Sequence, residues 1–296
     1  TGAVIREIDT GVGSVSLPNG LSAPTAVYAA DGKTVVYAYA GDMQGNVWKF
    51  DLRSTSPAAW TATRLFTAVK GGVAQPITGG LAVATEPVTG KRWVFFGTGR
   101  FLTTGDVDDR SVNAQSIYGV MDEGATYARA NLTARTIAVT SATANGYPVR
   151  AFEAKSALPT TSKGWYVDLP GAGERVVQDA QLASNFLVTA SMIPEGDACE
   201  GSGTGYINAL DAFTGTSGGN SFFDLNKDGA TDDTAVTGGL PVGSANMGVG
   251  MPTRPVLLPG QFVLGGSGDG SAAGLTGGRS FGMQWQRVSW REIRQD

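Results

Sequence analysis

The chain has 296 residues, of which 43 are glycine, 16% are charged and 42% are hydrophobic. This composition supplies enough apolar material for a core and disfavours a helical protein, because glycine destabilises helices. The net charge of −4 gives no basic surface for nucleic acid, and the absence of histidine excludes His-dependent catalytic triads and histidine metal sites.

Short runs of β-branched and aromatic residues, separated by turn-forming residues, predict a mostly β protein. These strands are expected at residues 34–40, 46–52, 92–97, 115–121, 164–169, 186–191, 205–210 and 255–258. Helix is expected only around residues 125–131 and at the extreme C-terminus. No run of eighteen apolar residues occurs, so direct membrane insertion is not expected. The N-terminus has neither an initiator methionine nor a signal-like region, which suggests an excised piece.

An apolar strand that ends in aspartate recurs along the chain, at Asp9, Asp51, Asp122, Asp168 and Asp211. A carboxylate at a strand end can accept the N–H groups of the following turn. Three of the four intervals match a four-stranded propeller blade, which takes about 40–45 residues, and the longest is expected to hold an insertion. The periodicity favours the later blades of a larger, N-terminally truncated β-propeller; by itself it leaves a β-sandwich or a β-helix open.

One motif points to a specific chemistry. Residues 224–233 follow the pattern D-x-N-x-D-G-x-x-D, in which oxygen ligands at alternate positions surround a hard cation and glycine permits a sharp turn. The cation is expected to be Ca²⁺, and its expected ligands are the side chains of Asp224, Asn226, Asp228 and Asp232 and the carbonyl of Ala230.

The expected glutamate at position 12 is replaced by Ala235, so a shortened loop closed by Asp232 or Asp233 is predicted instead of a helix-loop-helix hand. The alternative is a solvated acidic turn that binds nothing. Because four oxygen donors in nine residues would repel one another without a cation, the metal site is the favoured interpretation.

Segments spread over nearly the whole chain resemble, in their order, the C-terminal region of the PilY/PilC family of type IV pilus biogenesis and tip-associated adhesin proteins. These segments are residues 39–52, 75–78, 96–102, 115–122, 164–170, 173–177, 208–215 and 287–292. The resemblance implies a modified quinoprotein-like β-propeller over residues 1–296, with the calcium loop at residues 224–233. It also implies export to the pilus tip, outer membrane or cell surface of a Gram-negative bacterium.

In that family, calcium occupancy of such a loop governs whether pili stay extended or are retracted. The resemblance therefore implies a non-enzymatic domain that regulates pilus extension, twitching motility, surface adhesion and virulence. The implied partners are pilin, minor pilins or secretin-associated pilus machinery, with a host or surface ligand as a further candidate. The third-position aspartate of the family is Asn226 here, which should lower calcium affinity. The family's variable N-terminal adhesive region is not represented.

Two other functions remain as alternatives. A quinone-dependent dehydrogenase also combines a propeller with calcium, but this chain has neither adjacent cysteines nor a C-x-x-C-H haem site. A calcium-dependent glycan-binding module is the second alternative. The single Cys199 cannot form a disulfide within the chain, and the sequence does not show whether it pairs with a cysteine upstream.

Overall fold

The computed structural model describes residues 2–111, 114–196, 202–236, 239–258, 261–266 and 272–276. Over these residues the chain is built mainly of strands, with one short helix, α1 (Gly105–Asp108), and two 3₁₀ turns, η1 (Pro57–Ala59) and η2 (Arg129–Asn131). The all-β prediction is therefore confirmed. Every helix in this described part is too short and polar to traverse a lipid bilayer.

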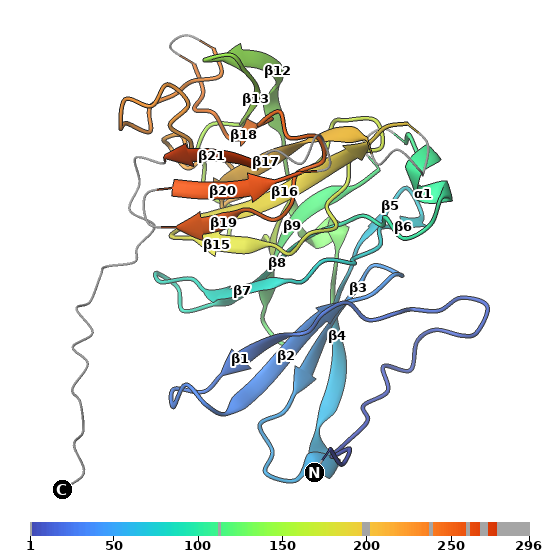
Figure 1. The fold of residues 1–296 in the computed structure, drawn as a ribbon. Coiled ribbons are helices and arrows are strands. Elements are labelled where there is room, and N and C mark those ends of the chain that lie inside the picture. The colour runs from blue at the N-terminus through green and yellow to red at the C-terminus, as the bar shows by residue number, and fades with distance from the viewer. Residues whose placement is uncertain are drawn as a thin grey trace, which may run out of the picture.

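The strands form four successive sheets and one small hairpin (Figure 1). The first sheet has the order β1-β2-β3-β4-β10 (Thr25–Tyr28, Val35–Gly41, Asn46–Asp51, Thr61–Thr67, Tyr127–Ala128). The second has the order β7-β8-β9-β14-β11 (Ala82–Thr85, Arg92–Gly97, Ser116–Asp122, Gly164–Asp168, Thr133–Arg135). The third has the order β15-β16-β17-β18-β13-β12 (Gln181–Ala183, Phe186–Pro194, Gly203–Asp211, Ser244–Ala245, Tyr147–Phe152, Ile137–Ala144). The fourth is β19-β20-β21 (Val256–Leu258, Gln261–Gly265, Ala272–Thr276), and the hairpin is β5-β6 (Val69–Lys70, Val73–Ala74).

Each of the four sheets is organised around an antiparallel meander. The first strand of every sheet, β1, β7, β15 or β19, lies at a sheet edge, and these four strands follow one another along one side of the molecule in Figure 1. Repeated four-stranded meanders are the pattern of propeller blades. All eight strands expected from the sequence are present, with bounds that differ by at most three residues.

A long insertion between β9 and β14 connects three sheets. Its strand β10 pairs in parallel with β4 of the first sheet, and β11 pairs in parallel with β14 of the second. The hairpin β12-β13 then joins the third sheet, where β13 pairs with β18. The helix expected around residues 125–131 is wrong, because this segment forms β10 and η2. The C-terminal helix expected from the sequence lies outside the described residues.

The recurring aspartates have the local role predicted for them at three equivalent positions. Asp51, Asp122 and Asp211 end β3, β9 and β17, the third strand of the first three sheets. Their carboxylates accept N–H groups from the turns that follow, at 3.1 Å from Arg53, 3.2 Å from Gly124, and 3.1 and 3.0 Å from residues 213 and 214. Each carboxylate thus stabilises the exit from a third strand.

The spacing argument based on these aspartates is wrong in detail. Asp168 ends β14, which is the fourth strand of its sheet, and Asp9 lies in no strand. The interval between Asp51 and Asp122 holds extra elements as expected, namely the β5-β6 hairpin and α1, but a second insertion, which joins three sheets, follows Asp122 and was not expected. The intervals between these aspartates therefore do not correspond to one blade each. The propeller is identified by its repeated meanders and not by a constant spacing of aspartates.

The hydrophobic core is continuous from one sheet to the next. One cluster, around Phe66, Phe96 and Tyr118, joins the first and second sheets, and the Phe66 and Tyr118 rings lie 5.3 Å apart. A second cluster joins the second and third sheets around Trp93 and Trp165. The first three sheets therefore pack face to face, with their apolar side chains buried between them.

Candidate metal-binding loop

The candidate loop lies in the connection between β17 and β18 and is anchored by aromatic residues. Phe222 and Phe223 immediately precede it and are fully buried, and the Phe222 ring lies 5.4 Å from that of Phe186 in β16. On the far side, Thr234 forms an antiparallel bridge with Pro241. The hydrophobic residues before the loop therefore fix its entry on the third sheet, and the bridge fixes its exit.

The structure brings three of the predicted ligands around the same stretch of backbone. The two carboxylate oxygens of Asp224 accept the N–H groups of Asp228 at 3.2 Å and Gly229 at 3.1 Å. The side-chain oxygen of Asn226 accepts the Asp228 N–H at 3.0 Å, and Asp228 accepts the N–H of Ala230 at 2.7 Å. Gly229 adopts a φ of 88°, in the region that favours glycine. The alternating oxygens thus curl the turn as the motif predicts.

The fourth predicted side-chain ligand, Asp232, differs from its neighbour Asp233 in burial. Asp232 is exposed, whereas the neighbouring Asp233 is buried and turned toward the start of the loop. Asp233 accepts the Leu225 N–H at 2.6 Å and the amide N–H of Asn145 at 2.6 Å. Of the two closing residues considered from the sequence, Asp233 therefore closes the loop by hydrogen bonds, and Asp232 is the carboxylate that stays accessible.

The acidic residues of the loop influence one another electrostatically. Burial raises the pKa of the Asp233 carboxyl, and the charges of Asp224, Asp232 and Asp228 raise it further, while the Leu225 N–H lowers it. Three neighbouring carboxylates thus disfavour the charged form of the fourth. A divalent cation at the loop would remove this repulsion.

The chemistry of the donors fits a hard cation, since carboxylate, amide and carbonyl oxygens are the ligands that calcium takes. Across the described ranges, however, no three Asp, Glu, Cys or His side chains are grouped as a formed metal site. The oxygens of Asp224 and Asp228 are used to accept loop N–H groups. Calcium binding at residues 224–233 therefore stays a prediction.

Asn145 is a contact of this loop that the sequence analysis missed. It lies at the tip of the β12-β13 hairpin, with a φ of 50°, and is followed by Gly146. An Asn-Gly pair is a signal for a hairpin turn, but nothing in the sequence connects this turn with a loop 88 positions away. The hairpin tip and the candidate metal-binding loop meet only because both attach to the third sheet.

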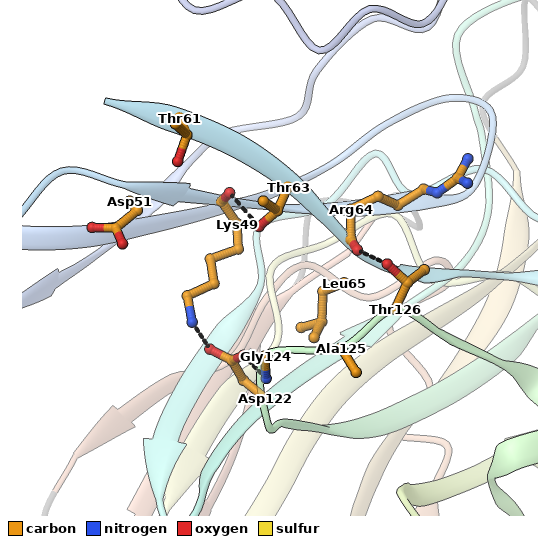
Figure 2. Close-up of a pocket in the computed structure, with 10 residues that line it drawn as sticks. All are labelled: Lys49, Asp51, Thr61, Thr63, Arg64, Leu65, Asp122, Gly124, Ala125 and Thr126. Carbon is orange, nitrogen blue, oxygen red and sulfur yellow. Dashed lines mark hydrogen bonds and ion pairs between the residues drawn. The ribbon is translucent and has the colours of Figure 1, made fainter. Parts of the chain in front are cut away.

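A separate hollow lies between β3, β4 and the turn after β9 (Figure 2). There Lys49 Nζ lies 2.6 Å from the Asp122 carboxylate, which also accepts the Tyr39 hydroxyl at 2.6 Å. Burial alone would raise the pKa of the Asp122 carboxyl, but the hydrogen bonds from Lys49 and Tyr39 lower it overall. Its buried charge is thus already compensated, and the cluster ties the first sheet to the second.

Comparison with known proteins identifies relatives along most of the chain. The family described as the PilY1 beta-propeller domain matches residues 1–143. A type IV pilus biogenesis factor PilY1 homolog of Xylella fastidiosa is 36% identical over 263 residues, which cover 86% of this chain and 20% of the relative. The type IV pilus biogenesis factor PilY1 of Pseudomonas aeruginosa is 28% identical over 275 residues, covering 78% of this chain and 24% of the relative.

A solved structure supports the fold. The crystal structure of the Pseudomonas aeruginosa PilY1 C-terminal domain matches with a TM-score of 0.77 and 24% sequence identity, over 94% of this chain and 64% of that chain. The chain therefore has the propeller fold of that domain. It spans about a fifth to a quarter of the full length of the relatives described above.

Proposed function

Because this chain belongs to the PilY1 beta-propeller family, we propose that residues 1–296 are a single non-enzymatic propeller domain of a type IV pilus biogenesis factor. The relatives are named as biogenesis factors of the type IV pilus. A location at the pilus tip or on the outer surface of a Gram-negative bacterium follows from that role. The partners that fit this role are pilin, minor pilins or secretin-associated pilus proteins.

The candidate metal-binding loop is the proposed regulatory element of this domain. Asp224, Asn226 and Asp228 would hold Ca²⁺ together with the carbonyl of Ala230 and the accessible carboxylate of Asp232. The observation that carries the proposal is the inward curl of the three alternating side chains around residues 228–230. The ion supplies positive charge that draws the carboxylates together.

Calcium would act by selecting one shape of the loop. Without the ion, the carboxylates of Asp224, Asp228 and Asp232 repel one another and favour a more open loop; with the ion they converge. In the ordered form, the loop presents a fixed surface to the pilus machinery. We propose that calcium occupancy of the loop decides between pilus extension and retraction, and thereby affects twitching motility and surface adhesion.

Calcium binding can be tested on the purified chain by isothermal titration calorimetry and urea unfolding. At calcium concentrations of 100 times the dissociation constant, the free energy of unfolding is expected to rise by about 2.7 kcal/mol, since the ion binds only the folded loop. Asp228→Ala should weaken binding by about tenfold or more, because it removes a charged ligand. EDTA should reverse the stabilisation.

The matched control is Asp9→Ala, which removes one exposed carboxylate far from the loop in sequence. It should bind calcium as the unchanged chain does. If the unchanged chain takes up no calcium, or if Asp228→Ala binds as tightly as the control, residues 224–233 are a solvated turn. In bacteria that carry Asp228→Ala in the full-length protein, twitching zones should differ from those of the Asp9→Ala strain.

A further inference from the structure

The ring of Tyr37 in β2 is surrounded by positive charge. Its centre lies 4.6 Å from Lys49 Nζ, 4.6 Å from the Arg92 guanidinium carbon and 5.1 Å from that of Arg53. Lys49 lies in β3 and Arg53 shortly after it, both in the first sheet, whereas Arg92 begins β8 of the second sheet. We call Tyr37 and these three cations the Tyr37 cluster. The cluster lies where the first and second sheets meet.

The carboxylates near this cluster neutralise two of its three cations. The Lys49 ammonium lies 2.6 Å from the Asp122 carboxylate (Figure 2). The Arg53 guanidinium lies 2.6 Å from the Asp51 carboxylate. Within the described part of the chain, Arg92 has no carboxylate at ion-pair distance. The cluster therefore carries one positive charge without a paired negative charge.

The carboxylate opposite Arg92 is already occupied. In the register of the second sheet, Arg92 lies directly across from Asp122. One Asp122 oxygen accepts the Lys49 ammonium and the Tyr39 hydroxyl, both at 2.6 Å. The other oxygen accepts the Gly124 N–H at 3.2 Å. Arg92 itself donates to the Tyr39 hydroxyl at the long distance of 3.4 Å, so N–H groups of its guanidinium remain for a further acceptor.

Arg92 is partly buried and nevertheless stays charged. Burial alone would lower its pKa, but the hydrogen bond with Tyr39 and the negative charge of Asp122 raise the pKa overall. The face of the Tyr37 ring compensates part of the positive charge. A full negative charge beside Arg92 would compensate it better, because Coulomb attraction is stronger where water is partly excluded.

We propose that the Tyr37 cluster binds one oxyanion group, a carboxylate or a phosphate, which accepts the remaining N–H groups of Arg92. The planar guanidinium fork matches the paired oxygens of such groups. The side chain of Arg53, which is 61% exposed, can approach the same anion from the first sheet. The single excess charge selects one anionic group, because a neutral ligand would leave it uncompensated and a cation would be repelled.

The oxyanion can come from a free anion or from an acidic side chain of a partner protein, and two probes distinguish these sources. Sodium phosphate tests the free anion, and a capped oligoglutamate peptide tests the side chain. The matched oligoglutamine peptide is the control for the peptide backbone. Isothermal titration calorimetry on the intact chain is carried out at low ionic strength, because salt screens such contacts. EDTA is present throughout, so that no binding passes through a calcium ion.

Saturable binding of phosphate, of the glutamate peptide or of both is expected, with one site per chain and no binding of the glutamine peptide. Whichever probe binds identifies the source of the oxyanion. The outcome is independent of the proposed metal site, since EDTA removes calcium. If neither anionic probe binds, or if the glutamine peptide binds as tightly as the glutamate peptide, the proposal is overturned.

Variants that remove one positive charge each locate the site. Arg92→Gln should weaken binding by about tenfold or more, because it removes hydrogen bonds to a charged group. Arg53→Gln changes an exposed side chain and should weaken binding about two- to fivefold. The control is Arg64→Gln in β4, since Arg64 is exposed and its side chain points away from Lys49 in Figure 2. It should bind as the unchanged chain does.

Circular dichroism shows whether each variant keeps the native fold. If Arg92→Gln does not fold, the comparison of Arg53→Gln with Arg64→Gln carries the test. Weakening of binding by Arg64→Gln as large as that by Arg92→Gln or Arg53→Gln would mean that the anion responds only to overall charge, which contradicts a site at the Tyr37 cluster.

Discussion

Replacing Glu174 by alanine is expected to lower the free energy of unfolding by about 3–5 kcal/mol, which is the usual cost of leaving one member of a buried ion pair without its partner. Arg150 Nη1 lies 2.8 Å from Glu174 Oε1, and the two side chains are 5% and 0% exposed. Glu174 also accepts the Ser191 hydroxyl at 2.7 Å and the Gly171 N–H at 2.9 Å.

The position of this pair explains why the loss should be large. Arg150 belongs to β13 of the third sheet, and Glu174 lies in the connection between β14 of the second sheet and β15 of the third, so the pair fastens this connection to the inserted hairpin. The Arg150 guanidinium lies 3.6 Å from the centre of the Tyr206 ring, and its Nε has no hydrogen-bond partner among the described atoms. Without Glu174, the buried cation would have no compensating charge.

Urea unfolding followed by circular dichroism measures this loss. Arg254→Ala is the control, since Arg254 pairs with Asp179 at 2.8 Å where both side chains are about half exposed. Its loss should stay below about 1 kcal/mol. The double variant Arg150→Met with Glu174→Leu should recover much of the stability lost in Glu174→Ala. Equal losses in Glu174→Ala and Arg254→Ala would refute the assigned role of the buried pair.

The sequence pattern predicted those parts of the fold that depend on local signals. The run of apolar residues at 92–97 coincides with β8, because a central strand is marked by its own buried side chains. The helix predicted around residues 125–131 is wrong, since alanine and arginine favour helix locally but residues 127 and 128 pair with β4. That pairing joins Tyr127 to Phe66, which lies far away in the sequence, so no local sequence pattern indicates it.

In the candidate metal-binding loop, too, the local pattern can be predicted from the sequence, whereas the long-range contacts cannot. The alternation of Asp224, Asn226 and Asp228 is visible in the sequence, and the structure gives these side chains a common set of backbone partners. The contact between Asn145 and Asp233 could not be predicted, because it depends on how the insertion packs on the third sheet.

Trp165→Ala is expected to lower the free energy of unfolding by about 3–5 kcal/mol, the range for removing a large aromatic side chain from a core. Trp165 in β14 is fully buried between the second and third sheets. Its ring lies so close to Gly119 and Gly215 that a Cβ on either glycine would come within 2.6 Å of it. Its indole N–H donates to the Ala212 carbonyl at 2.8 Å, which joins the two sheets by a directed bond.

Two further variants separate packing from hydrogen bonding at this position. Trp165→Phe keeps part of the ring volume but leaves the Ala212 carbonyl without its donor, so about 1–3 kcal/mol should be lost. Trp60→Ala is the matched control, because Trp60 is half-buried and its indole also donates to a carbonyl, that of Ser54 at 2.9 Å. Its loss should be clearly smaller, since it joins no two sheets. If urea unfolding gives Trp60→Ala and Trp165→Ala the same loss, the two sheets are held together by contacts other than this tryptophan.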